Sequence, residues 1–261
     1  MKPVRTFECR GYRIFVYREL TLRRGILVQG LPGIGLVGKI AVDYIVSTLG
    51  LEKVAELVGP GLLLPVGNAG VFVDQTGTLR LPSYKFYLYS GEEHDILFLT
   101  SEVQPVSWAQ YDVADCVLDF FSSLGGEKVI GVCGTSSETP AVEVVFTVAG
   151  SGSAPELEAL GLKRSAGGTI TGACGLLPAL AALKGIEGLV IMGSTHTPEP
   201  NFESSREVVR VLSKILKLEV NLEGLDKLIQ EEKAREEELR REIEKAEQAE
   251  ERKEGLPSWY V

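Results

Sequence analysis

Long apolar runs are missing from this sequence. No stretch of its 261 residues approaches the roughly 20 consecutive apolar residues that a membrane-spanning helix needs. Residues 1–20 carry charges throughout, so they also lack the apolar core of a secretory signal. We therefore expect a cytoplasmic protein that has no membrane partner.

Clusters of basic residues are missing as well. The formal net charge is -9, and Lys and Arg do not gather on any predicted element. A protein that binds the phosphate backbone of nucleic acids needs such a cluster. The charge pattern therefore excludes nucleic acid as an expected partner.

Residues that bind metals or form disulfide frameworks are few. The four cysteines, Cys9, Cys116, Cys133 and Cys174, lie far apart and form no Cys-x-x-Cys pair. This spacing favours reduced, mostly buried thiols over a disulfide framework or a zinc site. The two histidines, His94 and His196, supply no helical two-ligand motif. We expect neither a metal nor another cofactor.

Strand and helix patterns alternate from Arg13 to about Val220, with Gly and Pro at the joints. Such alternation predicts an α/β domain with a mixed, largely parallel sheet flanked by helices. Apolar runs at 96–99 and 189–192 are typical of central strands. The predicted strands are Gly25–Gln29, Gly70–Asp74, Tyr84–Ser90, Asp95–Thr100, Lys128–Cys133, Val142–Val148 and Gly188–Met192, and we expect the third and fourth to pair antiparallel. The predicted helices are Leu36–Leu49, Ser107–Leu124, Ala154–Leu160, Gly172–Leu183 and Ser204–Leu216.

Composition changes abruptly after Gly224. Residues 225–254 hold 12 acidic and 8 basic residues and no proline. Opposite charges stand four residues apart at Glu231/Arg235, Glu236/Arg240 and Glu237/Arg241, which stabilises a helix. The sequence thus divides into a domain at 1–224, a long charged helical extension at 225–254 and a tail at 255–261. Either the extension is solvated on all sides or its apolar positions pack on a partner helix.

A glycine-rich segment follows the strand predicted at 25–29 and opens the next helix. Gly33, Gly35 and Gly38 fit the Gly-x-Gly-x-x-Gly spacing of dinucleotide sites. Such a site also needs an acid at the tip of the second strand, about 20 residues on. The available acids, Glu52 and Glu56, are expected in a helix or loop. The acid that a dinucleotide site needs at a strand tip is therefore missing.

The same segment fits the spacing of a phosphate-binding P-loop. Gly33 and Gly38-Lys39 stand at the right positions, but Ile40 replaces the Ser or Thr that would hold magnesium. The glycines are therefore predicted to allow a tight turn and close packing of a helix on the sheet.

Four segments carry a resemblance to a known family. Leu31-Pro-Gly-Ile-Gly-Leu-Val-Gly-Lys-Ile-Ala-Val-Asp-Tyr44 resembles the signature of the proteasome assembly chaperone family, which includes the eukaryotic second assembly chaperone and its archaeal homologues. The resemblance continues through Ser101-Glu-Val-Gln-Pro105, Gly131-Val-Cys-Gly-Thr135 and Gly172-Ala-Cys-Gly-Leu-Leu-Pro178. It implies a domain similar in topology to purine nucleoside phosphorylases but without their activity. We accordingly expect a protein that is not an enzyme.

Few polar residues follow the predicted strands, where α/β proteins place their active sites. Thr135-Ser-Ser-Glu-Thr139 follows the strand at 128–133, and His196 follows the strand at 188–192. Neither forms a nucleophile elbow, and no carboxylate or metal partner can be assigned to His196. We predict no catalytic residue; a small polar ligand at this edge is the alternative.

The chain ends in Trp259-Tyr260-Val261, after a helix stop at Gly255-Leu-Pro257-Ser. Two large aromatics at a free end favour docking, because they bring contact area at little cost in rotamer entropy. The ending is similar to the hydrophobic-Tyr-any-residue motif by which proteasome activators and assembly chaperones enter pockets between α-ring subunits. The resemblance implies that Trp259 fills the apolar position, Tyr260 orients the tail and the Val261 carboxylate pairs with a pocket lysine. The alternative is a tail that folds back on its own domain.

A tail of three residues binds weakly, so useful affinity needs several tails in one assembly. We expect a homo-oligomer whose tails engage proteasome α-subunits, either to assist ring assembly or to cap the particle. Two alternatives stay open. One is a homo-oligomeric scaffold that pairs with a related paralogue and never meets the proteasome, and the other is a binding protein for a nucleoside-like ligand at the edge formed by Thr135–Thr139 and His196.

Overall fold

The chain divides after Val220 into two units, and a ten-stranded sheet organises the first of them. The computed structural model describes residues 2–150 and 154–254, and the side chains of the last helix as far as residue 243. The strands are β1 Arg5–Cys9, β2 Tyr12–Val16, β3 Gly25–Gly30, β4 Glu52–Val58, β7 Tyr84–Ser90, β8 Asp95–Thr100, β9 Gly126–Ser136, β10 Val144–Val148, β11 Lys163–Arg164 and β12 Glu187–Thr195. Their order across the sheet is β1-β2-β4-β7-β8-β3-β9-β12-β10-β11. A separate two-stranded sheet pairs β5, Phe72–Val73, with β6, Leu79–Arg80.

The sheet is mixed, but the prediction of a largely parallel sheet is wrong. Five of its nine strand pairings are antiparallel and four are parallel. Parallel neighbours need a crossover connection, whereas antiparallel neighbours accept short turns. In one half of the sheet, from β1 to β8, every pairing is antiparallel. Short turns join β1 to β2 and β7 to β8, whereas the chain reaches β4 from β2 by way of β3 and α1.

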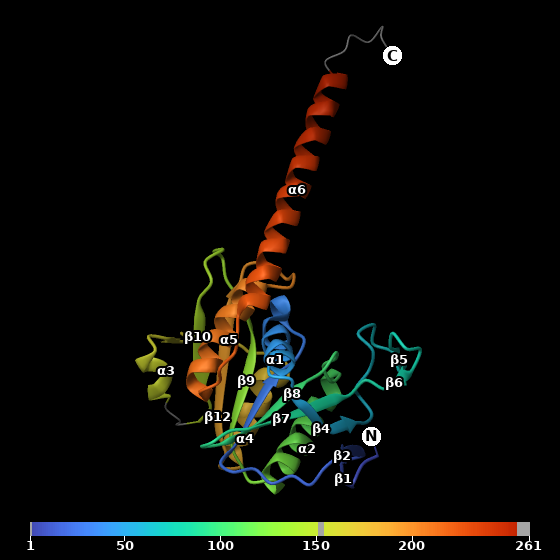
Figure 1. Ribbon diagram of the computed structural model, residues 1–261, viewed down its shortest axis with the longest axis vertical. Helices are drawn as coiled ribbons and strands as arrows, with labels where there is room; N and C mark the ends of the chain where they lie inside the picture. Colours follow the sequence, from blue (N-terminus) through green and yellow to red (C-terminus); the bar gives the residue numbers. More distant parts are fainter. Residues whose placement is uncertain (1, 151–153, 255–261) are drawn as a thin grey trace. The chain divides into compact units, whose positions relative to one another are not determined.

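Helices cover both faces of the sheet. They are α1 Val37–Thr48, α2 Gln110–Ser123, α3 Pro155–Ala159, α4 Ala173–Leu183 and α5 Phe202–Leu216, with short 3-10 turns η1 Ile34–Leu36 and η2 Ser107–Ala109. α1 packs beside α5 and α2 beside α4 (Figure 1). Gly30 of β3 faces Gly38 and Val42 of α1, whereas Gly131 of β9, one register position away, faces Cys174 of α4. Because successive strand residues point to opposite faces, the two helix pairs lie on opposite sides of the sheet.

The predicted central strands are confirmed. β8 is buried at all six positions, and β12 is buried at every position after its first. β7 and β8 have the predicted bounds and pair antiparallel, with Ser90 opposite Asp95. The largest buried cluster lies between β2, β4, β7, β8 and the helices α2 and α4. The uninterrupted apolar runs therefore mark strands that are covered on both faces.

Several strands escaped prediction, chiefly β1, β2 and β4. β1 and β2 form a hairpin whose turn residues, Arg10 and Gly11, both have positive φ angles, 48° and 84°. Two-residue turns of this kind match the twist of the strands that they join. Glu52 and Glu56 lie in β4 and not in a helix or loop, so that expectation is wrong. The residues of β4 favour a helix, but pairing with β2 and β7 on either side fixes an extended strand.

The cysteines are paired, so the expectation of four reduced thiols is also wrong. Disulfides join Cys9 of β1 to Cys116 of α2 and Cys133 of β9 to Cys174 of α4. The Cα atoms of the two pairs are 5.6 and 6.3 Å apart. Sequence spacing did not reveal these pairs, because 107 and 41 residues separate the partners and only the docking of α2 and α4 on the sheet brings them together.

The second unit begins at Asn221 and contains the charged helix α6, Glu223–Glu254. The side chain of Asn221 accepts a hydrogen bond from the backbone N–H of Glu223 at 2.8 Å. Acidic residues in the first turn complement the helix dipole. Of the predicted charge pairs, Glu237–Arg241 forms at 3.6 Å, and Lys227 adds a pair with Glu231 at 3.7 Å. Among the described residues, no helix is long and apolar enough to cross a membrane.

Candidate functional site

The predicted docking residues Trp259, Tyr260 and Val261 lie outside the described residues. Their role therefore stays a prediction. The site candidates in the described part of the chain all belong to the first unit. They are the glycine-rich turn after β3, a cavity at the carboxyl ends of the parallel strands, and a charged cluster on β4.

The glycine-rich turn brings α1 close to the sheet. A Cβ atom on Gly38 would collide with the carbonyl of Val132 in β9, and one on Gly30 would collide with the carbonyl of Gly38. Gly35 has a φ of 60°, which favours glycine. Gly33 differs, because its backbone is extended and the space around its missing side chain is open. Gly35 and Gly38 thus have the structural role that the sequence predicts.

The lysine that would serve a P-loop is engaged inside α1. Lys39 Nζ lies 2.7 Å from Oδ2 of Asp43, one turn further along the helix. Oδ1 of Asp43 accepts a hydrogen bond from Thr100 Oγ1 of β8 at 2.5 Å. These contacts fasten α1 to β8, and they hold the lysine side chain on a carboxylate of its own helix. The arrangement supports packing and not phosphate binding.

A polar cavity of about 340 Å³ opens at the carboxyl ends of β3 and β9. These strands are parallel neighbours, but the strands that follow them in the chain lie toward opposite edges of the sheet. β4 follows β3 and lies toward the edge strand β1, and β10 follows β9 and lies toward the edge strand β11. Ligands of α/β sheets gather at such switch points. Residues 31–34 after β3, residues 133–136 of β9 and the loop at 169–172 form its walls. None of the described lining residues is charged, so the polar groups of the cavity are hydroxyl, amide and backbone groups, and apolar side chains such as Leu31, Ile34 and Met192 complete the lining.

Of the residues that the sequence suggested as a ligand-binding edge, Thr135–Thr139 and His196, only some lie at this cavity. Thr135 and Ser136 line it. Ser137 instead accepts a hydrogen bond from the backbone N–H of Thr139 at 3.2 Å. Glu138 and His196 are exposed and do not belong to the described lining. The residues that the sequence grouped as one edge are thus divided between the cavity wall and the surface.

Gln104 is one of the cavity residues that sequence reasoning missed. Its Nε2 donates to the carbonyl of Pro32 at 2.6 Å, and its Oε1 accepts from the backbone N–H of Ala173 at 3.3 Å. One amide therefore joins the glycine-rich turn to the first turn of α4. Gly172 lies against this amide with a φ of 77°, so a larger residue is disfavoured there. Gln104 lies inside the family-like segment at 101–105, but no spacing rule indicates its contacts.

The charged cluster on β4 joins neighbouring parts of the sheet. Glu56 accepts hydrogen bonds from Tyr17 Oη at 2.9 Å, Lys53 Nζ at 2.7 Å and Ser83 Oγ at 2.6 Å. Burial alone would raise the pKa of Glu56, but the three donors outweigh it and the pKa is lowered. Burial and the bond to Glu56 raise the pKa of Tyr17 to about 12. Because each donor bonds directly to the Glu56 carboxylate, the cluster stabilises the packing of β4 against the segments that carry Tyr17 and Ser83.

Known proteins share the sequence pattern and the fold of this chain. The pattern of the PAC2 family matches residues 27–246. The chain is 30% identical over 213 residues to the uncharacterized protein MJ1210 of Methanocaldococcus jannaschii, and the alignment covers 79% of each protein.

Two solved structures from Pyrococcus furiosus are similar over nearly the whole chain. PbaB, an archaeal proteasome activator, superimposes with a TM-score of 0.77 at 25% identity and covers 90% of this chain and 99% of its own. PbaA, an archaeal homolog of proteasome-assembly chaperone, superimposes with a TM-score of 0.75 at 26% identity and covers 94% of this chain and 97% of its own. The likeness therefore extends well beyond the glycine-rich signature.

Proposed function

Because the chain belongs to the PAC2 family, we propose that it is a non-enzymatic, cytoplasmic chaperone or cap that binds proteasome α-ring subunits. The observation that carries this proposal is the likeness to PbaB and PbaA, which covers at least nine-tenths of the chain. One of these proteins is a proteasome activator and the other a homolog of proteasome-assembly chaperone. The aromatic ending of the sequence supports the same role.

We propose that the three parts of the chain divide the work. Residues 1–224 form the body, residues 225–254 carry the tail, and residues 255–261 dock. α6 has 32 residues, which corresponds to a spacer of roughly 48 Å at about 1.5 Å per residue. Trp259 would fill an apolar pocket, Tyr260 would orient the tail, and the Val261 carboxylate would pair with a lysine.

A single tail of this size supplies little binding energy. Several tails held by one assembly raise the effective concentration of each remaining tail after the first has bound. The proposal therefore includes a homo-oligomer that presents its tails together. Loss of the oligomer would weaken binding even if every tail were intact.

The test is co-purification with proteasome α-subunits. The full chain is compared with a chain that lacks residues 259–261, with Tyr260→Ala, and with Tyr260→Phe as the conservative control. A further variant carries one extra residue after Val261, which moves the carboxylate. We expect the deletion, Tyr260→Ala and the extension to lose binding. Absence of binding by the intact chain would overturn the proposal and favour the scaffold that pairs with a paralogue.

A second candidate function is the binding of a small, neutral polar ligand. The observation that favours it is the uncharged cavity at the carboxyl ends of β3 and β9. Nucleosides would be screened by thermal shift, with nucleotides and phosphate as charged comparisons, because a ligand at about 100 times its Kd stabilises the native state by roughly 2.7 kcal/mol. A shift that Thr135→Val abolishes would support this function. No shift with any of the compounds would exclude these ligands.

A further inference from the structure

The helical segment at 107–123, formed by η2 and α2, begins with two exposed aromatic side chains. Trp108 is 69% exposed and Tyr111 is 63% exposed. In the part of the chain that the structure describes, the other Phe and Tyr residues are buried or half-buried. The two exposed rings are three residues apart, about one helical turn, so they are neighbours on the surface. Trp and Tyr are enriched at protein interfaces, so this pair marks a candidate contact surface.

The indole of Trp108 rests on the loop that follows β4. The backbone N–H of Val106 donates to the carbonyl of Gly61 at 2.9 Å, which joins this loop to the start of η2. Gly61 lies against the indole, because a Cβ atom there would be 3.3 Å from the ring of Trp108. On the inner side of the same helical turn, Ala109 and Val113 are buried in the core. The exposed ring is therefore carried by a fixed part of the backbone, and less freedom is lost when a partner binds.

Three carboxylates lie along one side of α2, close to the exposed rings. Asp112, Asp115 and Asp119 follow one another at intervals of three and four residues, so they share one side of the helix. Arg10 approaches these carboxylates at 3.8, 3.3 and 3.2 Å, in that order. Lys184 contacts Asp115 at 3.5 Å and Asp119 at 2.7 Å. Three carboxylates thus meet two cations, and the unbalanced negative charge remains on Asp112, which has the longest contact.

Asp112 lies beside the two rings. It stands four residues after Trp108 and next to Tyr111, and residues four apart on a helix have their Cβ atoms roughly 5–6 Å from each other. The side chain of Asp112 is 54% exposed. We call Trp108, Tyr111 and Asp112 the α2 face. The cation–ring contacts in the described part of the chain all lie on other aromatic residues, so no cation of this chain covers the rings of the α2 face.

An aromatic ring beside an unbalanced carboxylate is suited to a cation. The guanidinium group of arginine is planar, so it can stack on a ring while its N–H groups donate to the carboxylate. A lysine ammonium is a compact and strongly hydrated charge, which stacks less well. The formal net charge of -9 also attracts basic segments and repels acidic ones, a second copy of this chain included.

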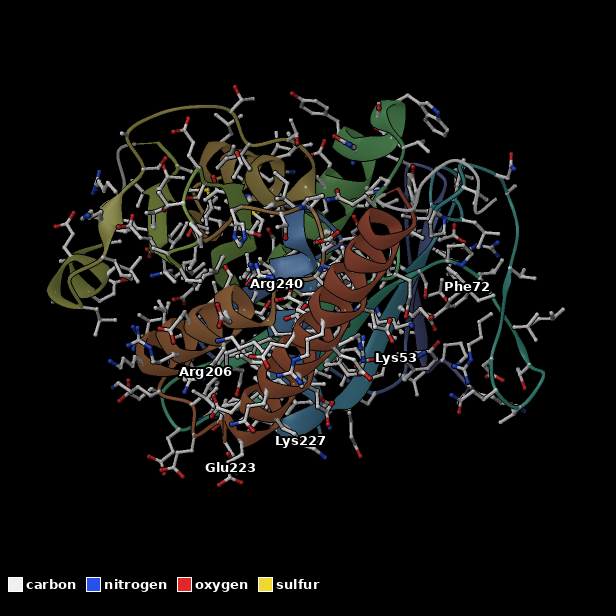
Figure 2. The ribbon with its side chains drawn as sticks, turned by 90° about the horizontal axis from the view of Figure 1, so that it is seen from above. Lys53, Phe72, Arg206, Glu223, Lys227 and Arg240 are labelled. Carbon is white, nitrogen blue, oxygen red and sulfur yellow. A yellow bond between two sulfur atoms is a disulfide. The ribbon has the colours of Figure 1, made fainter. Side chains whose placement is uncertain are left out.

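We propose that the α2 face binds an arginine side chain on a basic segment of a partner protein. Figure 2 shows the green ribbon of α2 at the edge of the first unit, away from Lys53 of β4. The contact lies on the body of the protein and needs none of residues 259–261, so the inference goes beyond the proposed function. A chain whose tail does not dock should still bind arginine on the α2 face.

The first test uses the fluorescence of Trp108. The sequence has two tryptophans, so in the full chain with Trp259→Phe the tryptophan emission comes from Trp108 alone. The probe is a peptide whose arginines are separated by Gly and Ser, and the comparison peptide has lysine at the arginine positions. We expect the arginine peptide to change the emission in a saturable way and the lysine peptide to bind at least about threefold more weakly. Unchanged emission with the arginine peptide, or equal affinity for both peptides, would overturn the proposal.

The second test measures the affinity of the labelled arginine peptide for variants of the full chain by fluorescence anisotropy. Trp108→Ala and Asp112→Asn should each weaken binding roughly three- to tenfold, with unchanged circular dichroism. Tyr111→Phe keeps the ring and should bind like the wild type. Glu92→Gln is the matched control for Asp112→Asn, because it removes one exposed carboxylate in the turn between β7 and β8, at the other end of β8. Equal losses in these two variants would show attraction by net charge alone and would contradict the proposal.

Two further measurements separate this contact from other uses of the same residues. The chain without residues 259–261 should bind the arginine peptide as tightly as the full chain, and a loss of binding there would assign the peptide to the tail instead. Light scattering gives the mass of the particle for the wild type and for Trp108→Ala. A mass that falls in the variant while peptide binding is unchanged would assign the α2 face to a contact between copies, against the proposal. Failure of tail docking changes none of these results.

Discussion

Lys39 pairs with Asp43 one turn further along α1, and 2.7 Å separate Nζ from Oδ2. The side chains are 22% and 41% exposed, so the ion pair itself stabilises the fold little. The other oxygen of Asp43 accepts the hydroxyl of Thr100, which is buried. The carboxylate therefore matters more as the acceptor for Thr100 than as the partner of Lys39.

This relationship predicts unequal effects for two substitutions in α1. Lys39→Ala should lower the free energy of unfolding by about 0.5 kcal/mol or less, because it removes a partly exposed pair. Asp43→Ala should lower it by roughly 1–3 kcal/mol, because it leaves the buried hydroxyl of Thr100 without an acceptor. Urea unfolding measures both values. Equal losses of unfolding free energy in the two variants would contradict the conclusion that Asp43 acts mainly as the acceptor for Thr100.

The glycine-rich turn offers a comparison between two glycines. Gly38→Ala should destabilise the protein by about 1–3 kcal/mol or more, because the new Cβ collides with the carbonyl of Val132. Gly33→Ala should be tolerated, since its backbone is extended and no atom lies within 4 Å of the new Cβ. Thermal unfolding of the two variants measures this difference, and equal losses of stability would contradict the packing role of Gly38.

Stability should fall at alkaline pH. The pKa of Tyr17 is raised by burial and by its bond to Glu56, from about 10 to about 12. The stabilisation is fully present below pH 10, where the unfolded chain also keeps its proton, and is lost as the pH rises toward 12. Burial raises the pKa of Tyr12 and Tyr84 in the same direction.

Tyr17→Phe should therefore make the loss between about pH 10 and pH 12 shallower without abolishing it. The urea midpoint, measured across this range for the wild type and the variant, gives the two slopes. Identical slopes would show that Tyr17 does not contribute to the alkaline loss.

The disulfides should dominate the response to reduction. Replacing both Cys9 and Cys116 by Ala should lower the free energy of unfolding by about 2–5 kcal/mol, and the Cys133/Cys174 double variant should lose somewhat less. The reason is that the first pair closes a longer loop, with a sequence separation of 107 against 41 for the second pair. Alkylation of the unfolded, unreduced protein followed by mass measurement should count no free thiols. Four alkylated cysteines would contradict both disulfides.

The sequence correctly predicted those helices and strands whose local hydrophobic pattern matches their burial in the folded protein. β7 and β8 have the predicted bounds, and α1, α2, α4 and α5 differ from prediction by one or two residues at most ends, after the 3-10 turn at Ser107 is counted with α2. β4 was missed because Glu52, Lys53 and Ala55 favour a helix, and only its neighbours β2 and β7 fix it as a strand.

The candidate cavity was predicted only in part, for a related reason. Thr135 and Ser136 follow a recognisable buried strand, so their position at its carboxyl end could be read from the sequence. Gln104 and the Cys133–Cys174 pair depend on how α4 meets the sheet. Contacts of that kind join segments that are far apart in the chain, and no local pattern encodes them.

The position of β3 at the centre of the sheet bears on the order in which the protein can fold during synthesis. β3 is complete at Gly30, but its two neighbours, β8 and β9, end only at Thr100 and Ser136. Pairings between such distant segments are slow to form, and strand edges that wait for them are prone to aggregate. In a nascent chain on the ribosome, β3 therefore lacks both neighbours until 70 further residues have emerged and lacks β9 until 106 have emerged. We proposed that this protein assists the assembly of other proteins. Its own β3 should also need protection from aggregation during synthesis, until its neighbouring strands have emerged.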